Sequence, residues 1–209
     1  MTALSWPLAT GETRAFAQDV VGAEVHVEPP PAPEDREPAL GFEVHVSAIA
    51  PIARQGLCPA GPRCVFGGGG GVGGSVERRF ASGLAIGLGY DALFVDAAGV
   101  YEIGVVQFLR AAVRFVFFPR HIFHLVLDAG VGALVFGETF RVAAVGGALQ
   151  FGIGGELEVT QSIAFTSALV TRIFTTSSFT TPSDSALRGA GADFDAAIAL
   201  QLGVQIVEP

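Results

Sequence analysis

The 209-residue sequence contains no lysine, and all twelve of its basic residues are arginine. These arginines are outnumbered by twenty acidic residues, and the resulting net charge of −8, with no basic cluster, argues against a nucleic-acid partner. Charged residues make up only 15% of the chain and hydrophobic residues 50%, which is too apolar for a disordered protein. The sequence therefore predicts a folded chain, and its length suits a single domain.

Long hydrophobic runs are missing as well. A membrane-spanning helix needs about 20 consecutive, mostly apolar residues, and no window of eighteen residues here is uninterrupted. The best candidate, residues 122–136, is fifteen residues long and contains His124 and Asp128. The composition, with 28 glycines and 17 phenylalanines, favours β structure over helices. Together these features argue against a helical membrane protein.

The clearest pattern present is an apolar alternation with a period of two. In residues 101–117 the odd positions are almost all apolar, whereas Glu102, Arg110 and Arg114 fall on even positions. Residues 194–206 repeat the pattern. A period of two is typical of a β-strand with two different faces, and about ten tilted residues cross a bilayer. The alternation therefore predicts a transmembrane β-barrel.

Eight strands are expected after residue 38, separated wherever clusters of Gly, Pro, Asp or Ser break the alternation. An even number of strands places both ends of the barrel domain on the same side. The fold class predicted is all-β, an eight-stranded antiparallel up-and-down transmembrane β-barrel. Its longer connections, 52–64 and 176–192, would lie on one side. The expected strands are 39–51, 65–77, 82–95, 100–118, 121–136, 140–160, 162–175 and 193–207.

Energetic cost decides which face of each strand meets lipid. An arginine on the lipid face at the bilayer midplane costs about 2–4 kcal/mol, so the charged face should line the lumen. Only the glycine-rich strand 65–77 shows no clear face. The side chains expected in the lumen are Glu43, His45, Asp91, Glu102, Arg110, Arg114, His124, Asp128, Glu156, Arg172 and Asp195. Those expected to face lipid are Phe42, Leu84, Ile86, Leu88, Leu109, Val113, Phe115, Phe123, Leu125, Leu127, Phe151, Ile153, Ile198, Leu200 and Leu202.

The interior of this barrel is predicted to be filled rather than open. Eight strands enclose a space that side chains nearly fill, and buried charges are costly unless they are paired. We therefore expect a packed polar lumen, with a salt-bridge network and some water. Glycines on the inward face, such as Gly87 and Gly89, would make room for the long side chains opposite.

The first 38 residues are expected to form an N-terminal segment outside the barrel. Residues 15–17, Ala-Phe-Ala, have the small-x-small form of a signal-peptidase site, although no basic or long apolar region precedes them. Residues 1–17 are therefore either the remnant of a signal peptide or a tail without this role. Residues 28–38 are rich in proline and charge and predict an extended linker. The domain boundaries predicted are 1–38 and 39–209.

Two cysteines, Cys58 and Cys64, lie close together between proline and glycine residues. A small disulfide loop in an oxidising compartment is expected, with two thiols as the alternative.

Three sequence patterns bear on further chemistry. Gly69, Gly71 and Gly74 fit a dinucleotide-binding fingerprint, but no βαβ unit or P-loop lysine accompanies them. His121 and His124 fall on opposite faces of a strand, which argues against a shared metal ion. The serines of the longest loop have no histidine nearby in that loop, so its turn-forming residues predict a solvated, mobile segment. No catalytic residue, cofactor or metal site is therefore expected.

On this strand pattern, residues 39–209 resemble the small eight-stranded outer-membrane barrels, the OmpA-like transmembrane domain and its OmpX and OmpW relatives. The resemblance implies a signal peptide, periplasmic termini, insertion by the barrel-assembly machinery and residence in the bacterial outer membrane. It implies no enzymatic activity by itself.

The function expected is that of a non-enzymatic outer-membrane barrel with a structural or surface-interaction role, exercised through its outer loops. The sequence does not indicate a surface partner. Two alternatives remain open at this point. One is a narrow pore for small solutes or ions, with selectivity set by the lumen charges. The other is a soluble β-barrel that binds an apolar ligand.

Overall fold

The structure is a computed structural model that describes residues 38–117, 121–138, 141–189 and 193–208. The expectations for the N-terminal segment, including the signal-peptide remnant ending at Ala17 and the linker, lie outside the described residues. Within the described ranges, no helix is both long enough and apolar enough to cross a membrane.

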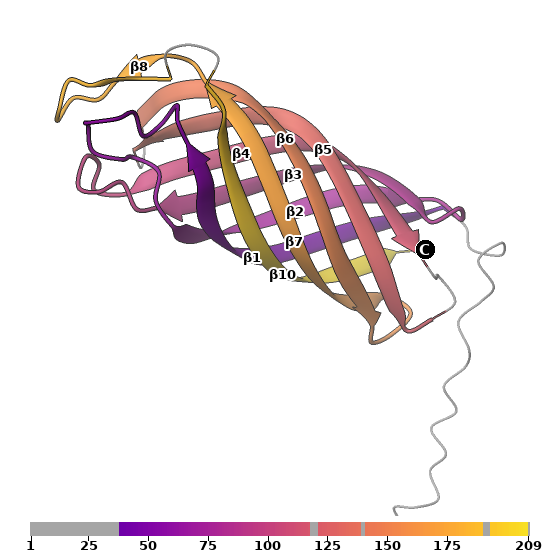
Figure 1. Cartoon of the computed structure of the whole chain (residues 1–209). Coiled ribbons are helices and arrows are strands. Elements are labelled where there is room, and N and C mark those ends of the chain that lie inside the picture. Colours follow the sequence, from indigo (N-terminus) through magenta and orange to yellow (C-terminus); the bar gives the residue numbers. More distant parts are fainter. Residues whose placement is uncertain (1–37, 118–120, 139–140, 190–192, 209) are drawn as a thin grey trace, which may run out of the picture. The chain divides into compact units, whose positions relative to one another are not determined.

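Eight long antiparallel strands close into a barrel (Figure 1). Neighbours around the barrel follow one another in the sequence, and β1 closes the ring by pairing with β10, so the topology is up-and-down. The predicted fold class is confirmed. The strands are β1 (Ala39–Arg54), β2 (Gly69–Arg79), β3 (Leu84–Val95), β4 (Gly104–Phe117), β5 (Phe123–Glu138), β6 (Arg141–Glu158), β7 (Ile163–Thr176) and β10 (Asp195–Glu208).

The two ends of the barrel differ in the length of their connections. At the end where β1 begins and β10 ends, here called the terminal end, β2 and β3 are joined by residues 80–83, and β6 and β7 by residues 159–162. At the opposite end, here called the loop end, longer segments follow β1, β3 and β7 (Figure 1). The segment after β7 contains a separate two-stranded sheet, formed by β8 (Phe179–Thr180) and β9 (Leu187–Arg188).

Exposure alternates along the strands, as the period of two requires. In β1, residues 41–49 are buried at every odd position and exposed at every even one. All the side chains expected to face lipid lie at outward positions of their strands, and most of them are exposed large apolar groups. The barrel therefore has an apolar outer wall, as a lipid-facing surface requires.

The glycine-rich strand β2 takes a defined register between β1 and β3. Val72 pairs with Val46 of β1 and Ala92 of β3, and Val76 pairs with Phe42 and Leu88. Both valines point outward, whereas Glu77 is buried on the inner face. The strand begins and ends later than the predicted 65–77, so Arg79 belongs to the strand and not to a turn.

Candidate functional site

The barrel interior divides into a polar half near the terminal end and an apolar half near the loop end. The polar half holds most of the charged side chains predicted to line the lumen. The division follows from the sequence of each strand: in β4, Arg114 and Arg110 lie toward the terminal end, and Phe108 and Val106 toward the loop end.

Asp91 of β3 lies in the polar half, next to its boundary with the apolar half, and is fully buried. Its Oδ1 lies 2.6 Å from Nε2 of His45, which belongs to β1. Its Oδ2 accepts hydrogen bonds from Arg172 of β7, at 2.9 Å, and from Nη1 of Arg110 of β4. Side chains from three other strands therefore converge on one carboxylate. Such pairing offsets the cost of burying the charges, which is several kcal/mol per ion.

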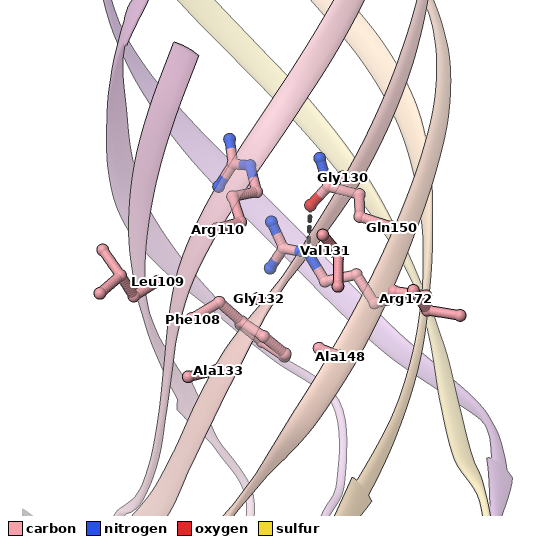
Figure 2. Close-up of a pocket in the computed structure, with 11 residues that line it drawn as sticks. Phe108, Leu109, Arg110, Gly130, Val131, Gly132, Ala133, Ala148, Gln150 and Arg172 are labelled. Atoms are coloured by element: carbon pink, nitrogen blue, oxygen red, sulfur yellow. Dashed lines mark hydrogen bonds between the residues drawn. The ribbon is translucent and has the colours of Figure 1, made fainter. Parts of the chain in front are cut away.

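A chain of hydrogen bonds extends this cluster across the barrel. Arg172 Nε donates to Gln150 Oε1 at 3.0 Å, and Gln150 Nε2 donates to Asp128 Oδ1 at 2.7 Å. Figure 2 shows the Arg172–Gln150 bond, and Arg110 of β4 nearby. Gln150 thereby links Asp128 to Arg172, which in turn bonds to Asp91.

Two inward glycines leave the space that this cluster occupies. A Cβ at Gly89 would lie 2.8 Å from Cζ of Arg110. A Cβ at Gly73 would overlap the Asp91 carboxylate and lie 2.5 Å from Nε2 of His45. The glycine-rich sequence of β2 therefore has a packing role at Gly73, because a larger residue there would displace the His45–Asp91 pair.

A second charge cluster lies closer to the terminal end. Arg114 contacts Glu43 at 2.7 Å and Glu77 at 3.3 Å. Arg79 donates to Glu77 at 2.7 Å and reaches both carboxylate oxygens of Glu156, at 2.8 and 2.7 Å. These two arginines join strands β1, β2, β4 and β6 across the lumen.

Sequence reasoning missed several members of the network. Glu77 and Arg79 were missed because glycines mask the alternation of β2. A usable signal was present: Ser75, Glu77 and Arg79 share one parity. Gln150 and Gln205 were missed because only charged side chains were assigned to the network. Gln205 is buried and donates to Glu77 at 2.5 Å.

Two of the predicted lumen residues lie outside the charge network. Glu102 is exposed and precedes β4, which begins at Gly104 and not at residue 100, so its assignment to the lumen was wrong. Asp195 is buried on the inner face but at the loop end, apart from the charge network. Its Oδ1 accepts backbone hydrogen bonds from Gly56 at 3.1 Å and Leu57 at 3.2 Å, so it anchors the segment after β1.

His124 and Glu156 face each other on β5 and β6 near the terminal end, and both are buried. Nε2 of His124 also lies 3.8 Å from Oε1 of Glu158.

The loop-end half of the lumen is filled by apolar side chains, which differs from the expected all-polar interior. Loop residues pack onto the strand residues beneath them: Phe66 makes an edge-to-face contact with Phe174 at 5.3 Å, and Phe179 packs against Phe136 at 5.7 Å. We call this cluster the apolar plug. Its larger members are Ile49, Leu57, Val65, Phe66, Leu93, Val95, Val100, Tyr101, Val106, Phe108, Leu134, Phe136, Phe174 and Phe179.

The two halves of the interior meet at Arg172 and Phe108. The Arg172 guanidinium lies 4.6 Å from the centre of the Phe108 ring, a cation–π geometry. In Figure 2, Arg110 and Gln150 lie on one side of this boundary and Phe108 and Ala148 on the other. A cavity of only about 10 Å³ remains beside them.

A slightly larger cavity, of about 30 Å³, lies among the charges of the polar half, beside Glu43, Arg114 and Asp128. It has room for about two water molecules with polar partners.

Part of the segment after β7 is folded onto the apolar plug. Phe179, Thr181 and Arg188 are buried, whereas most of its other described residues are exposed, as expected for a solvated loop. Arg188 is almost fully buried and donates to Asp184 Oδ2 at 2.7 Å and to the backbone oxygen of Arg63 at 2.7 Å. Hydrogen bonds from Arg188 and Thr181 hold the pKa of Asp184 well below its usual range. The disulfide between Cys58 and Cys64 is present and closes the loop after β1.

No protein-family model and no curated protein matches the sequence. Among solved structures, Neisserial surface protein A is similar, with a TM-score of 0.57 and 11% identity over 80% of this chain and 96% of that chain. The outer membrane protein OprG from Pseudomonas aeruginosa gives a TM-score of 0.54 and 11% identity over 83% of this chain and 97% of that chain. At such identities the similarity concerns the fold alone, and it confirms the resemblance to small outer-membrane barrels.

Proposed function

We propose that this chain is a closed, non-enzymatic barrel of the bacterial outer membrane that presents a folded loop cap at the cell surface. The loop cap comprises the described loop-end residues 55–68, 96–103 and 177–189. The observation that carries the proposal is the filled interior. An apolar plug occupies one half of the lumen and an ion-paired network the other. The role is therefore structural or one of surface interaction, with the loops as the contact region.

A membrane location is supported by the apolar outer wall. Side chains such as Leu88, Phe151 and Leu202 are at least half exposed in the middle of their strands. A soluble barrel would leave this wall in contact with water, whereas contiguous apolar patches on soluble monomers rarely exceed a few hundred Å². We infer that the barrel-assembly machinery inserts this chain into the membrane, as the resemblance to small outer-membrane barrels implies.

A narrow pore receives less support than a closed barrel. Ion passage needs a continuous polar path, and the phenylalanines of the apolar plug lie across any such path at the loop end. In the polar half, the arginines that could attract anions are already bound to carboxylates.

The proposed absence of catalysis is supported by where the candidate groups lie. The exposed serines of the segment after β7, Ser178 and Ser183 among them, are at the loop end. The buried histidines, His45 and His124, lie in the polar half. A hydrolytic serine needs a base within hydrogen-bond reach. These serines and histidines lie at different positions along the barrel axis and are not within that reach.

Thiol labelling of intact cells tests the location and the orientation. Because the native cysteines are bonded to each other, a Ser178→Cys variant carries one reactive thiol at the loop end. A Ser82→Cys variant places the same thiol in the exposed turn at the terminal end. A membrane-impermeant maleimide should label Ser178→Cys on intact cells and Ser82→Cys only after lysis. Equal labelling of both, or the reverse pattern, would overturn the proposed placement.

A further inference from the structure

Three side chains with metal-binding groups converge at the terminal end of the lumen. His124 on β5 pairs directly with Glu156 on β6, and Glu158 follows two residues later on the same face of β6. Directly opposed residues bring their Cβ atoms to about 5 Å, and diagonal neighbours remain within reach of long side chains. One nitrogen or carboxylate oxygen from each of the three lies within 4.8 Å of the others.

His124 is the side chain that points to a ligand. Only 1% of it is exposed, and within the described part of the chain neither of its ring nitrogens has a hydrogen-bond partner. Most buried polar side chains have such a partner. The imidazole lies against two carboxylates, and a neutral imidazole nitrogen is a common metal ligand.

The charge of the lumen also favours a cation. In the described polar half, six carboxylates meet four guanidinium groups, so acidic side chains outnumber the arginines there. Arg79 occupies two acceptor positions of Glu156. A carboxylate offers about four such positions, so Glu156 retains capacity for a metal ion.

We propose that His124, Glu156 and Glu158 bind one divalent transition-metal ion of the zinc class. Imidazole together with carboxylate oxygen suits Zn²⁺, whereas Ca²⁺ and Mg²⁺ prefer ligand sets made only of oxygen. The site extends beyond the proposed surface role and does not depend on it. It also differs from the pair of histidines that sequence spacing argued against, since the ligands beside His124 come from β6.

Only a small movement is needed to close the site. Metal–ligand distances of about 2.0–2.2 Å require the three donor atoms to approach one another by roughly 1 Å. Glu158 is the member nearest the mouth of the barrel, where its side chain is partly exposed. An ion can reach the site through the mouth of the barrel, where Glu158 lies.

Calorimetric titration of the folded full-length protein in detergent with zinc chloride tests the proposal. We expect saturable binding of one Zn²⁺ per chain and a higher temperature of heat-modifiable migration when zinc is present, because the metal binds only the folded barrel. The variants His124→Gln and Glu158→Gln should each weaken binding on the order of a hundredfold. The matched control His121→Gln, an exposed histidine three residues away, should bind as the wild type does.

Three results would overturn the proposal: no saturable binding to the wild type, unchanged affinity in His124→Gln, or loss of binding in His121→Gln. Heat-modifiable migration shows whether each variant forms the barrel. If His124→Gln does not fold, Glu158→Gln at the mouth decides the matter by itself: unchanged zinc affinity in that variant contradicts the site.

Discussion

At the scale of single residues, the interior depends most on Asp91. This carboxylate is fully buried and bonds to His45, Arg110 and Arg172 from three other strands. Because the three partners belong to different sides of the barrel, the carboxylate fixes their strands relative to one another.

Replacement of Asp91 should therefore be costly. In Asp91→Ala, two arginines and a histidine lose their shared carboxylate in a buried site, and we expect a loss of about 3–5 kcal/mol in the free energy of unfolding. Denaturant titration in detergent micelles measures it. The control Glu102→Ala removes an exposed carboxylate and should change the stability by no more than about 0.5 kcal/mol. Similar values for the two variants would contradict the role assigned to Asp91.

The odd or even position of each residue along its strand predicted many of the charged side chains that meet in the lumen. The failures of this rule have physical causes. Arg110, Arg114 and Arg172 could be placed inside because each lies among apolar residues of the opposite parity. Glu102 continues the parity of β4, but the strand begins only at Gly104. Arg79 lies at an inward position of β2. The many glycines of this strand have no side chains, so its sequence does not show which face points into the lumen.

At the scale of elements, strands with a contrast between their faces were predicted to within a few residues. β10 was expected at 193–207 and is observed at Asp195–Glu208. The β8–β9 hairpin was not predicted, because its strands are two residues long and no alternation can develop. Its order comes from tertiary contacts, such as the packing of Phe179 on Phe136, which a local pattern cannot show.

The hairpin should depend on the ion pair between Asp184 and Arg188. The pKa of Asp184 is lowered in the folded protein. The stability that the Asp184–Arg188 ion pair adds to the hairpin is therefore complete above the ordinary carboxyl pKa of 3.8, and it is lost only as the pH falls through the lower pKa of the folded state. Hydrogen exchange of residues 179–188, corrected for intrinsic rates, should therefore be equal at pH 7 and pH 5. Asp184→Asn should raise it severalfold at both values.

The variant Asp193→Asn serves as the control for this experiment, since it removes an exposed carboxylate from the same segment. Exchange in Asp184→Asn that matches both the control and the wild type would show that the pair does not order the hairpin.

At the scale of the whole molecule, the barrel combines an apolar outer wall with an interior that changes from polar to apolar along its axis. The apolar plug could not be predicted from charge parity. Near the loop end, inward residues such as Leu134 and Phe174 are as apolar as their outward neighbours, so the two faces show no contrast there. Closure also requires loop residues, such as Leu57 and Phe66, that lie far in sequence from the strands they contact.

Matched leucine substitutions test whether the outer wall lies in lipid. Leu200, in the middle of β10, and Leu187, in the loop cap, have similar exposed fractions of 50% and 57%. Because lipid does not solvate a charge, Leu200→Arg should destabilise the barrel by about 2–4 kcal/mol in vesicles, while Leu187→Arg should have almost no effect. Equal effects of the two substitutions would mean that both sites face the same solvent.

The closed interior is the central claim, and ion conductance across a planar bilayer tests it most directly. The protein is inserted into the bilayer, and heat-modifiable migration of the same preparation verifies that it is folded. We predict no discrete conductance steps in concentrated salt, because the apolar plug and the paired charges leave no continuous aqueous path. A stable, stepwise current carried by the wild-type protein would contradict the account.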